Sequence, residues 1–325
     1  MNLPRRQFFR LAAGAFAAPA IARHALADAY PSRSVRLLSG FAPAGGNDII
    51  ARLMAQWLTE RLGQTFVVEN RPGAGTNIAA EIVINSPPDG YTLFVTNLSN
   101  AINATLYEKL NFNFTRDMLP VAGIAQAPAA FAISSSVPSK TVTEFIAHAK
   151  ANPGRINMGS AGVGSTGHLA GELFKMMAGV NLIHVPYRGN APALTDLIAG
   201  QIEVLFPSLG SSIEYVKTGK LRTLAVTGAT RSDALPDLPT VAETLPGYQA
   251  ASFYGIGAPR NTPVEVVEVL NKAVNAGLAD PKLKARLADL GSVPLPGQPA
   301  AFGELIADET EKWGKVIRFA GIKSQ

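Results

Sequence analysis

The sequence GSAGVGSTGH, residues 159–168, is the stretch that decides the fold of this chain. Apolar residues recur behind it at the spacing of one helical face, from Leu169 to Met177. Ser165 and Thr166 are residue types that cap helix N-termini. We therefore predict a glycine loop that leads into a helix over residues 169–180. The unpaired N–H groups and the positive dipole end of such a helix favour a carboxylate or phosphate. An ordinary capped helix behind a flexible turn is the alternative.

Two further glycine stretches lie in the first third of the chain. The first, AGGND at residues 44–48, stands between a predicted strand over 35–41 and an amphipathic helix that Gly63 ends. The second, RPGAG at residues 71–75, separates a predicted strand from a helix that runs to residue 84. Neither has the spacing of a phosphate-binding P-loop or of a dinucleotide fingerprint. Asp48 is expected to cap its helix rather than to touch a ligand.

Strands and helices alternate with short connections along most of the chain. This alternation predicts an α/β fold with mostly parallel sheets covered by helices, in which ligands bind beyond the carboxyl ends of the strands. Two extended segments, residues 121–136 and 252–259, are predicted to cross between two lobes. We expect residues 28–127 and 251–325 to form lobe 1 and residues 128–250 to form lobe 2. The C-terminal helices are expected to cover lobe 1.

Residues 1–27 have the three parts of an export signal. An arginine pair at residues 5–6 precedes an alanine-rich apolar run over 11–21, and the sequence ALA at 25–27 fits a cleavage site. The arginine pair is similar to a twin-arginine signal, and Sec export is the alternative. The apolar run is too short to span a bilayer. We therefore expect an exported, periplasmic protein whose mature chain begins near Asp28.

The composition excludes several classes of function. Residues 1–27 hold four arginines and no acidic residue, so they account for four of the five net positive charges of the chain. No basic run interleaved with aromatic residues follows, and nucleic acid is not an expected partner. The absence of cysteine excludes disulfides, thiolate metal sites and a cysteine nucleophile. The four histidines show no metal-binding spacing, so neither a metal nor a cofactor is expected.

Several short motifs follow one another in a characteristic order: FAPAGGND (41–48), NRPGAG (70–75), PDGYTL (88–93), GSTGHL (164–169), ELF (172–174) and HVPYRG (184–189). This ordered set resembles the Bug (TctC-like) extracytoplasmic solute receptors of tripartite tricarboxylate transporters, over nearly the whole mature chain. The resemblance implies a type II periplasmic-binding-protein fold whose two lobes close on a small carboxylate, which is then delivered to membrane permease subunits. The sequence departs from the family pattern after Gly75, with Thr76 and Ala79 where glycines are frequent. We expect a monomer.

The resemblance also implies which residues surround the ligand. In the family, backbone N–H groups, small polar side chains and bridging waters hold most of the ligand. Phe41 is expected to form an apolar wall, while Tyr187 and Arg188 are expected to close over the ligand. The other residues of the predicted site are Gly46, Asn47, Ala74, Gly75, Asn97, Ser160, Ser165, Thr166 and Ser208.

Some of these residues have a second interpretation. Arg188 can pair with a carboxylate of the ligand or make an ordinary surface ion pair. His168 and His184 are interpreted as structural residues. An exported serine hydrolase that uses Ser165 or Ser208 is the alternative function, although the chain has no G-x-S-x-G nucleophile elbow.

Overall fold

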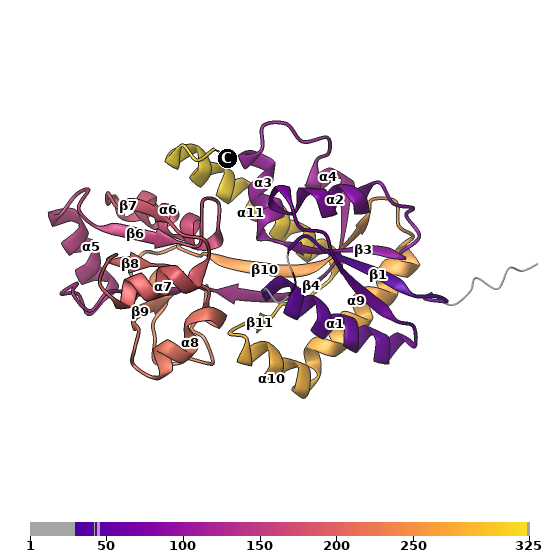
Figure 1. The fold of residues 1–325 in the computed structure, drawn as a ribbon. Helices are drawn as coiled ribbons and strands as arrows, with labels where there is room; N and C mark the ends of the chain where they lie inside the picture. Colours follow the sequence, from indigo (N-terminus) through magenta and orange to yellow (C-terminus); the bar gives the residue numbers. More distant parts are fainter. Residues whose placement is uncertain (1–29, 42, 44–45, 324–325) are drawn as a thin grey trace, which may run out of the picture.

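The chain folds into two α/β lobes joined by two long strands (Figure 1). The computed structural model describes residues 30–41, 43 and 46–323. The expected export signal, residues 1–27, lies outside the described residues. Among the helices of the described part, none combines the length and the apolar character needed to cross a membrane.

The first lobe is built from the N-terminal and C-terminal parts of the chain. Its N-terminal elements are β1 (Val35–Ser39), α1 (Gly46–Leu62), β2 (Phe66–Asn70), the 3-10 turn η1 (Ala74–Thr76), α2 (Asn77–Ile84), β3 (Thr92–Asn97), α3 (Leu98–Leu106), α4 (Phe114–Asp117) and β4 (Met118–Pro128). Its C-terminal elements are β10 (Ala251–Pro259), α9 (Val264–Ala279), α10 (Pro281–Asp289), β11 (Val293–Pro294) and α11 (Pro299–Ala320).

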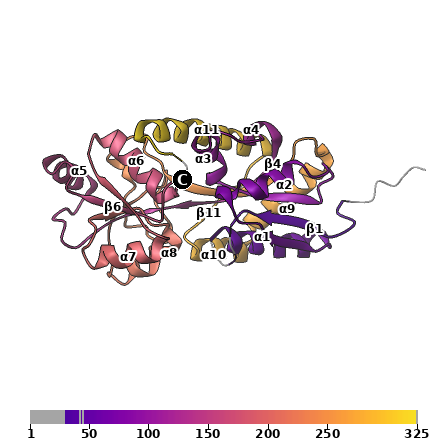
Figure 2. The ribbon, with the colours of Figure 1, turned by 45° about the horizontal axis from the view of Figure 1, so that its top comes forward.

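The second lobe is built from the middle of the chain. Its elements are β5 (Ala130–Ile133), α5 (Val142–Ala151), β6 (Asn157–Ser160), α6 (Thr166–Ala178), β7 (Ile183–Pro186), α7 (Asn190–Ile198), β8 (Val204–Leu205), α8 (Leu209–Lys217), β9 (Arg222–Val226) and the 3-10 turn η2 (Val241–Glu243). Figure 2 shows helices on both sides of the strands in each lobe.

Each lobe has one sheet in which most strands share a direction. The strand order is β11-β4-β10-β3-β1-β2 in lobe 1 and β7-β6-β8-β5-β9 in lobe 2. In lobe 1, β1 pairs in parallel with β2 and β3, and β10 lies antiparallel between β3 and β4. In lobe 2, β5 lies antiparallel between β8 and β9. The sheets are therefore mixed, and the predicted two-lobed α/β fold is confirmed.

The sequence predicted the helices that follow the glycine loops but missed α3, α8 and the four-residue α4. Helix α3 begins directly after β3, where the sequence is Asn-rich, and Asn97 caps it by accepting the N–H of Ser99. Helix α8 begins after β8 with Ser208 as its N-cap residue. Both helices have nine residues. Each begins immediately behind a strand end, so polar residues that looked like part of a loop belong to a helix start.

The two lobes are joined where β4 passes into β5 and where β10 begins. Thr227 is fully buried and is hydrogen-bonded to the chain at both of these connections. Its hydroxyl oxygen accepts the N–H of Ala129 at 2.7 Å and donates to the carbonyl oxygen of Ala250 at 2.5 Å. Its backbone N–H donates to the carbonyl of Ala129, and its carbonyl accepts the N–H of Ala250. A single residue thus fixes the two connections relative to each other.

We expect Thr227→Val to lower the free energy of unfolding by about 1–3 kcal/mol, because the valine leaves the buried N–H of Ala129 without its acceptor. Thr223→Val on β9, the strand that ends just before Thr227, is the matched control, because the buried Thr223 hydroxyl has no partner among the described residues. The control should stay within about 0.5 kcal/mol of the wild type. Urea denaturation measures both variants, and equal losses in the two would contradict the role of the Thr227 hydroxyl.

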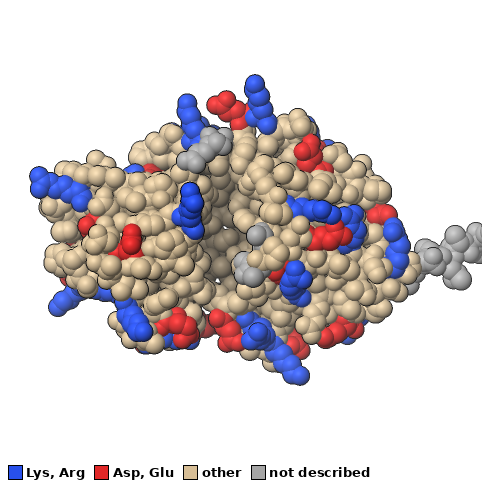
Figure 3. Space-filling model, in the orientation of Figure 1, with Lys and Arg blue, Asp and Glu red and all other residues tan. Residues whose placement is uncertain are grey.

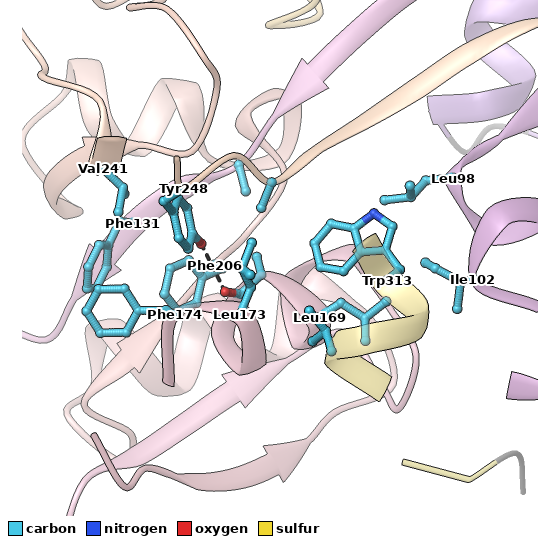
Figure 4. Close-up of a cluster of buried hydrophobic side chains, with 14 of the residues drawn as sticks. Leu98, Ile102, Phe131, Leu169, Leu173, Phe174, Phe206, Val241, Tyr248 and Trp313 are labelled. Atoms are coloured by element: carbon cyan, nitrogen blue, oxygen red, sulfur yellow. Dashed lines mark hydrogen bonds between the residues drawn. The ribbon is translucent and has the colours of Figure 1, made fainter. Parts of the chain in front are cut away.

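The C-terminal helix α11 ties the two hydrophobic cores together. Trp313 on α11 is fully buried. Figure 4 shows it between Leu98 and Ile102 of α3 in lobe 1 and Leu169 of α6 in lobe 2. These residues belong to one continuous apolar cluster that extends into the centre of lobe 2. The C-terminal helix therefore packs against both lobes, beyond its expected role of covering lobe 1.

Candidate ligand-binding cleft

Two adjoining cavities lie between the lobes, with volumes of about 230 Å³ and about 170 Å³. They share Ala127, Ser208 and Tyr254, so they form one cleft. Together they have the size of a small-molecule site. Figure 3 shows the hollow between the lobes, with a basic side chain at its left rim and uncharged residues in its depth. The first cavity is further lined by Gly46, Ile49, Ile50, Gly210, Ser211, Leu290 and Ser292, and the second by Ala129, Ala161, Ser165, Thr166, Gly167, Asn190, Phe206 and Ser252.

Four helices begin at this cleft. Helix α1 begins at Gly46, α6 at Thr166 and α7 at Asn190, and α8 begins directly after Ser208. The first N–H groups of a helix have no partner within the helix, and the helix dipole makes this end positive. One of the four helices comes from lobe 1 and three from lobe 2, so an anion in the cleft meets positive helix ends from both sides.

Ser208 lies at the centre of the polar groups on the lobe 2 side. Its hydroxyl oxygen accepts a hydrogen bond from Asn190 Nδ2 at 3.2 Å and lies 2.8 Å from Ser211 Oγ. These side chains come from the starts of α7 and α8. They form a small, uncharged set of donors and acceptors that can reorient toward a ligand oxygen.

Tyr254 forms the floor of the cleft. It lies in the middle of β10, the strand that joins the lobes, and it lines both cavities. Its hydroxyl oxygen is 3.5 Å from the position that a Cβ on Gly46 would take, beside the start of α1. Burial raises the pKa of the Tyr254 phenol, an effect partly offset by a hydrogen bond with Ser252. The phenol therefore keeps its proton at neutral pH and can donate it to a carboxylate.

Buried asparagines stand behind the cleft in lobe 1. Asn47 accepts a hydrogen bond from Ser39 Oγ at 2.7 Å, and Asn97 caps α3. The Nδ2 groups of Asn47, Asn77 and Asn97 are buried, and none has a partner among the described residues. An unpaired buried donor costs free energy, so these amides are suited to a water or ligand oxygen that satisfies them.

The segment that precedes α2 is conformationally strained. Ala74 and Thr76 have φ values of 44° and 85°, in the region that favours glycine, and Gly73 and Gly75 also have positive φ. Such conformations persist where the surrounding structure fixes them, and they cluster at ligand-binding sites. Ala74 and Gly75 are exposed at the rim of lobe 1 and do not line either cavity.

The structure brings some of the predicted site residues together and places others elsewhere. Gly46, Ser165, Thr166 and Ser208 line the cleft. Asn47, Asn97 and Ser160 are buried behind it. Phe41, Ala74, Gly75, Tyr187 and Arg188 do not line the cavities of the described part.

Tyr187 and Arg188 have different surroundings just behind β7. The hydroxyl of Tyr187 donates to Asp196 Oδ2 at 2.7 Å, and burial together with this bond raises the pKa of Tyr187 to about 12. Arg188 is exposed and makes no ion pair with an acidic residue of the described part. Among the described residues, Arg188 therefore does not form the surface ion pair that was considered for it, and its side chain is exposed to solvent.

The hydrolase alternative is not supported. The hydroxyl of Ser165 caps α6 by accepting the N–H of His168, and His168 Nδ1 accepts the N–H of Gly164 instead of meeting a serine. Ser208 contacts Asn190 and Ser211 and no imidazole of the described residues. Neither serine has a base that could take its proton.

Sequence reasoning missed several residues of the cleft. Tyr254 and Ser252 were assigned only to a crossing strand. An aromatic residue in a glycine-rich strand between two lobes is a signal that could have indicated a residue lining the cleft. Asn190 and Ser211 were missed because they belong to helix starts whose position depends on the strand order.

The sequence profile of the tripartite tricarboxylate transporter family receptors, TctC, matches residues 50–322. The chain belongs to this family. Family members are solute-binding receptors, so the chain is an exported, periplasmic solute-binding protein of the TctC type.

Individual relatives agree with this membership. Protein BugT from Bordetella pertussis is 32% identical over 95% of this chain and 96% of its own length. The structure of R. palustris Rpa4515 with adipate superposes with a TM-score of 0.78, at 38% identity over 90% of this chain and 99% of that chain. MatC from Rhodopseudomonas palustris with bound malate has a TM-score of 0.73 at 31% identity, over 89% of this chain and 100% of that chain. The predicted resemblance to Bug receptors is confirmed.

Proposed function

We propose that this TctC-family protein captures a small carboxylate in the cleft between its lobes and delivers it to the permease subunits of a tripartite tricarboxylate-type transporter. The observation that carries the proposal is the convergence of four helix N-termini, at Gly46, Thr166, Asn190 and Ser208, on one cleft. Adipate and malate, the ligands of two related structures, are small dicarboxylates, and this agrees with the chemistry of the cleft.

The carboxylate is held by dipoles rather than by a cation. Among the described residues that line the two cavities, none is Lys, Arg, Asp or Glu. Hydrogen bonds from helix-end N–H groups and hydroxyls to a charged oxygen are each stronger than hydrogen bonds between neutral groups. Several such donors can replace the water that a carboxylate loses on entering the cleft.

A ligand panel tests the proposal. Thermal shift and titration calorimetry with adipate and malate should show binding, whereas adipamide, which has the same length and no charge, should not bind. A ligand present at about a hundred times its Kd adds about 2.7 kcal/mol to the free energy of unfolding. Mass spectrometry of small molecules that co-purify with the protein extends the panel. Stabilisation by the diamide equal to that by the carboxylates would contradict the proposal.

Arg188→Ala should weaken carboxylate binding by less than about tenfold, because the exposed guanidinium does not line the cleft. Lys217→Ala is the control, since Lys217 is an exposed cation at the C-terminal end of α8, far along the helix from its ligand-facing start. Calorimetry with the best carboxylate of the panel measures both. If Arg188→Ala lost more than about a thousandfold in affinity, Arg188 would be the main positive charge that balances the carboxylate. Binding by helix-end dipoles alone would then be contradicted.

The remaining features of the proposal concern export, assembly and the lobe boundaries. We infer that residues 1–27 are an export signal, of twin-arginine or Sec type, that the mature protein is monomeric, and that it does not catalyse a reaction. We also infer that the chain passes between the lobes at residues 127/128 and 250/251. The described pairing of β4 with β10 up to Pro128 and Ala251 supports these boundaries.

A further inference from the structure

Beneath the loop that leads into α6, two histidines form a stacked pair. The rings of His168 on α6 and His184 on β7 lie 3.7 Å apart, measured between their centroids, at an interplanar angle of 13°. His168 is 4% exposed. Neither ring lines the cleft of the described residues, so the pair does not contact a ligand there.

The pair holds the loop of residues 160–165 at both ends. His184 Nε2 lies 2.7 Å from Ser160 Oγ, and this oxygen accepts the N–H of Gly162 at 3.1 Å. His168 Nδ1 accepts the N–H of Gly164 at 3.1 Å. Within the same loop, Ala161 and Ser165 line the second cavity. The two imidazoles therefore fix a loop whose opposite side faces the cleft.

These contacts require one protonation state of His168. Its Nδ1 must carry a lone pair to accept the N–H of Gly164, so the ring proton is on Nε2. Nε2 lies 3.6 Å from Glu172 Oε1. Burial opposes ionisation of Glu172, but hydrogen bonds from His168 and Lys175 outweigh it and place the Glu172 pKa below its ordinary value. An ionised Glu172 thus favours a proton on Nε2 and leaves Nδ1 for the loop.

A second proton on His168 would disrupt this arrangement. A proton on Nδ1 would face the N–H of Gly164, so two donors would meet and the hydrogen bond to the loop would be lost. The charged side chains of α6 beside the ring are Glu172 and Lys175, which form an ion pair at 2.8 Å. Strands β6 and β7 add no acidic or basic side chain other than His184.

We propose that His168 and His184 are positioning residues, which hold the loop 160–165 in its ligand-binding shape through the contacts of His168 Nδ1 with the N–H of Gly164 and of His184 Nε2 with Ser160 Oγ. This inference rests on the proposed function for its effect on affinity, but its structural part concerns the loop alone. Loss of the acceptor at residue 168 then loosens the loop and lowers the affinity for carboxylates.

His184 makes the stability of lobe 2 depend on pH. Burial, together with the nearby His168, lowers the pKa of His184 to about 4. The unfolded chain binds this proton near pH 6.5, so the group is charged in the unfolded protein and neutral in the folded one between these two values. Stability is therefore lost as the pH falls from about 6.5 to about 4, and His184→Gln should reduce this loss.

Two variants of His168 separate positioning from packing. In His168→Asn the side-chain oxygen can take the place of Nδ1 and accept the N–H of Gly164, but it cannot be protonated. In His168→Phe the ring and the stack remain, but no acceptor is left. Thermal melting establishes that each variant is folded, and His184→Gln serves as a further variant if His168→Phe does not fold, since its amide can replace Nε2 beside Ser160.

Nuclear magnetic resonance on the ligand-free protein labelled with 15N in glycine and histidine tests the structural part. We expect the proton of His168 on Nε2 at about pH 8, and hydrogen exchange of the Gly164 amide in His168→Asn close to that in the wild type. In His168→Phe, hydrogen exchange of this amide should be about tenfold faster or more. A proton on His168 Nδ1 at about pH 8, or an unchanged Gly164 amide in His168→Phe, would overturn the proposal.

Calorimetry with adipate then measures the effect on binding. We expect His168→Asn to bind within about threefold of the wild type and His168→Phe to bind about tenfold more weakly, because only the asparagine keeps an acceptor for the N–H of Gly164. Equal affinities of the wild type and His168→Phe would contradict the link between the pair and the ligand. Failure of the wild type to bind any carboxylate would count against the proposed function, while the resonance experiment would still decide the role of the pair.

Discussion

Gly46→Phe should remove carboxylate binding, with a loss of about a hundredfold or more, while leaving the protein folded. Gly46 is the first residue of α1 and lines the first cavity. A Cβ at this position would lie 3.5 Å from the hydroxyl of Tyr254, an ordinary contact, so the backbone accepts a side chain. The ring of a phenylalanine would then extend beside Tyr254, fill the cavity and cover the N–H groups at the start of α1.

Graded variants at Gly46 and a remote glycine control this experiment. Gly46→Ala adds only the Cβ and should retain most of the affinity. Gly297→Phe places the same ring on a half-buried glycine before α11, outside the cleft, where an added Cβ would lie 3.8 Å from Ala301 Cβ, so it should leave binding unchanged. Calorimetry and thermal melting measure all three, and undiminished binding by Gly46→Phe would place the ligand outside this cleft.

Gly164 is a less suitable position for the same test, although it belongs to the loop on the lobe 2 side. Its φ of +75° disfavours any side chain, and a Cβ there would lie 3.1 Å from Leu106 Cδ2 of α3, in the other lobe. A bulky residue at Gly164 would combine backbone strain with a clash between the lobes. Loss of binding in such a variant would not show which of the two caused it.

Trp313→Ala should lower the free energy of unfolding by about 3–5 kcal/mol, the range for removing a large aromatic side chain from a core. Trp313 is fully buried, between α3 of lobe 1 and α6 of lobe 2 (Figure 4). Its Nε1 donates to Glu309 Oε2 at 2.5 Å, and Glu309 is itself 7% exposed. The alanine variant would therefore leave a cavity and also remove a donor from a buried carboxylate, which would keep only Lys312.

Trp313→Phe separates these two effects. It keeps most of the apolar volume and removes only the donor to Glu309, so its loss of stability should be clearly smaller than that of the alanine variant. Urea denaturation with two spectroscopic probes measures both variants. A loss below about 1 kcal/mol in Trp313→Ala would show that the packing between α11 and the two lobes adds little to stability.

The sequence predicted those parts of the site that depend on neighbours in the chain. Glycines followed by capping residues and an apolar helical face indicated the starts of α1 and α6, and Ser165 caps α6 by accepting the N–H of His168. Helix capping and amphipathic spacing operate over a few residues, so a single sequence contains all the information they need. The alternation of strands and helices likewise indicated an α/β fold.

Other parts of the site were decided by the tertiary structure alone. Tyr254 becomes the floor of the cleft because β10 pairs with β3 on one side and β4 on the other, a register that no local pattern encodes. His168 and His184 stack because β6 and β7 pair in parallel beside the start of α6. Trp313 couples the lobes because α11 packs on both α3 and α6.

The difference between the predicted and the unpredicted parts of the site has one physical cause, the range of the contacts that form them. A cap or an amphipathic helix is stabilised by contacts within one or two turns, so the sequence by itself determined the glycine loops, their helices and the anion-binding character of the helix starts. Which loops face one another depends on strand order and on the two crossing strands that Thr227 binds together, and these involve residues separated by about a hundred positions or more. The shape of the cleft therefore arises only when both lobes have formed, whereas the burial that lowers the pKa of His184 arises when the strands and helices of lobe 2 pack together.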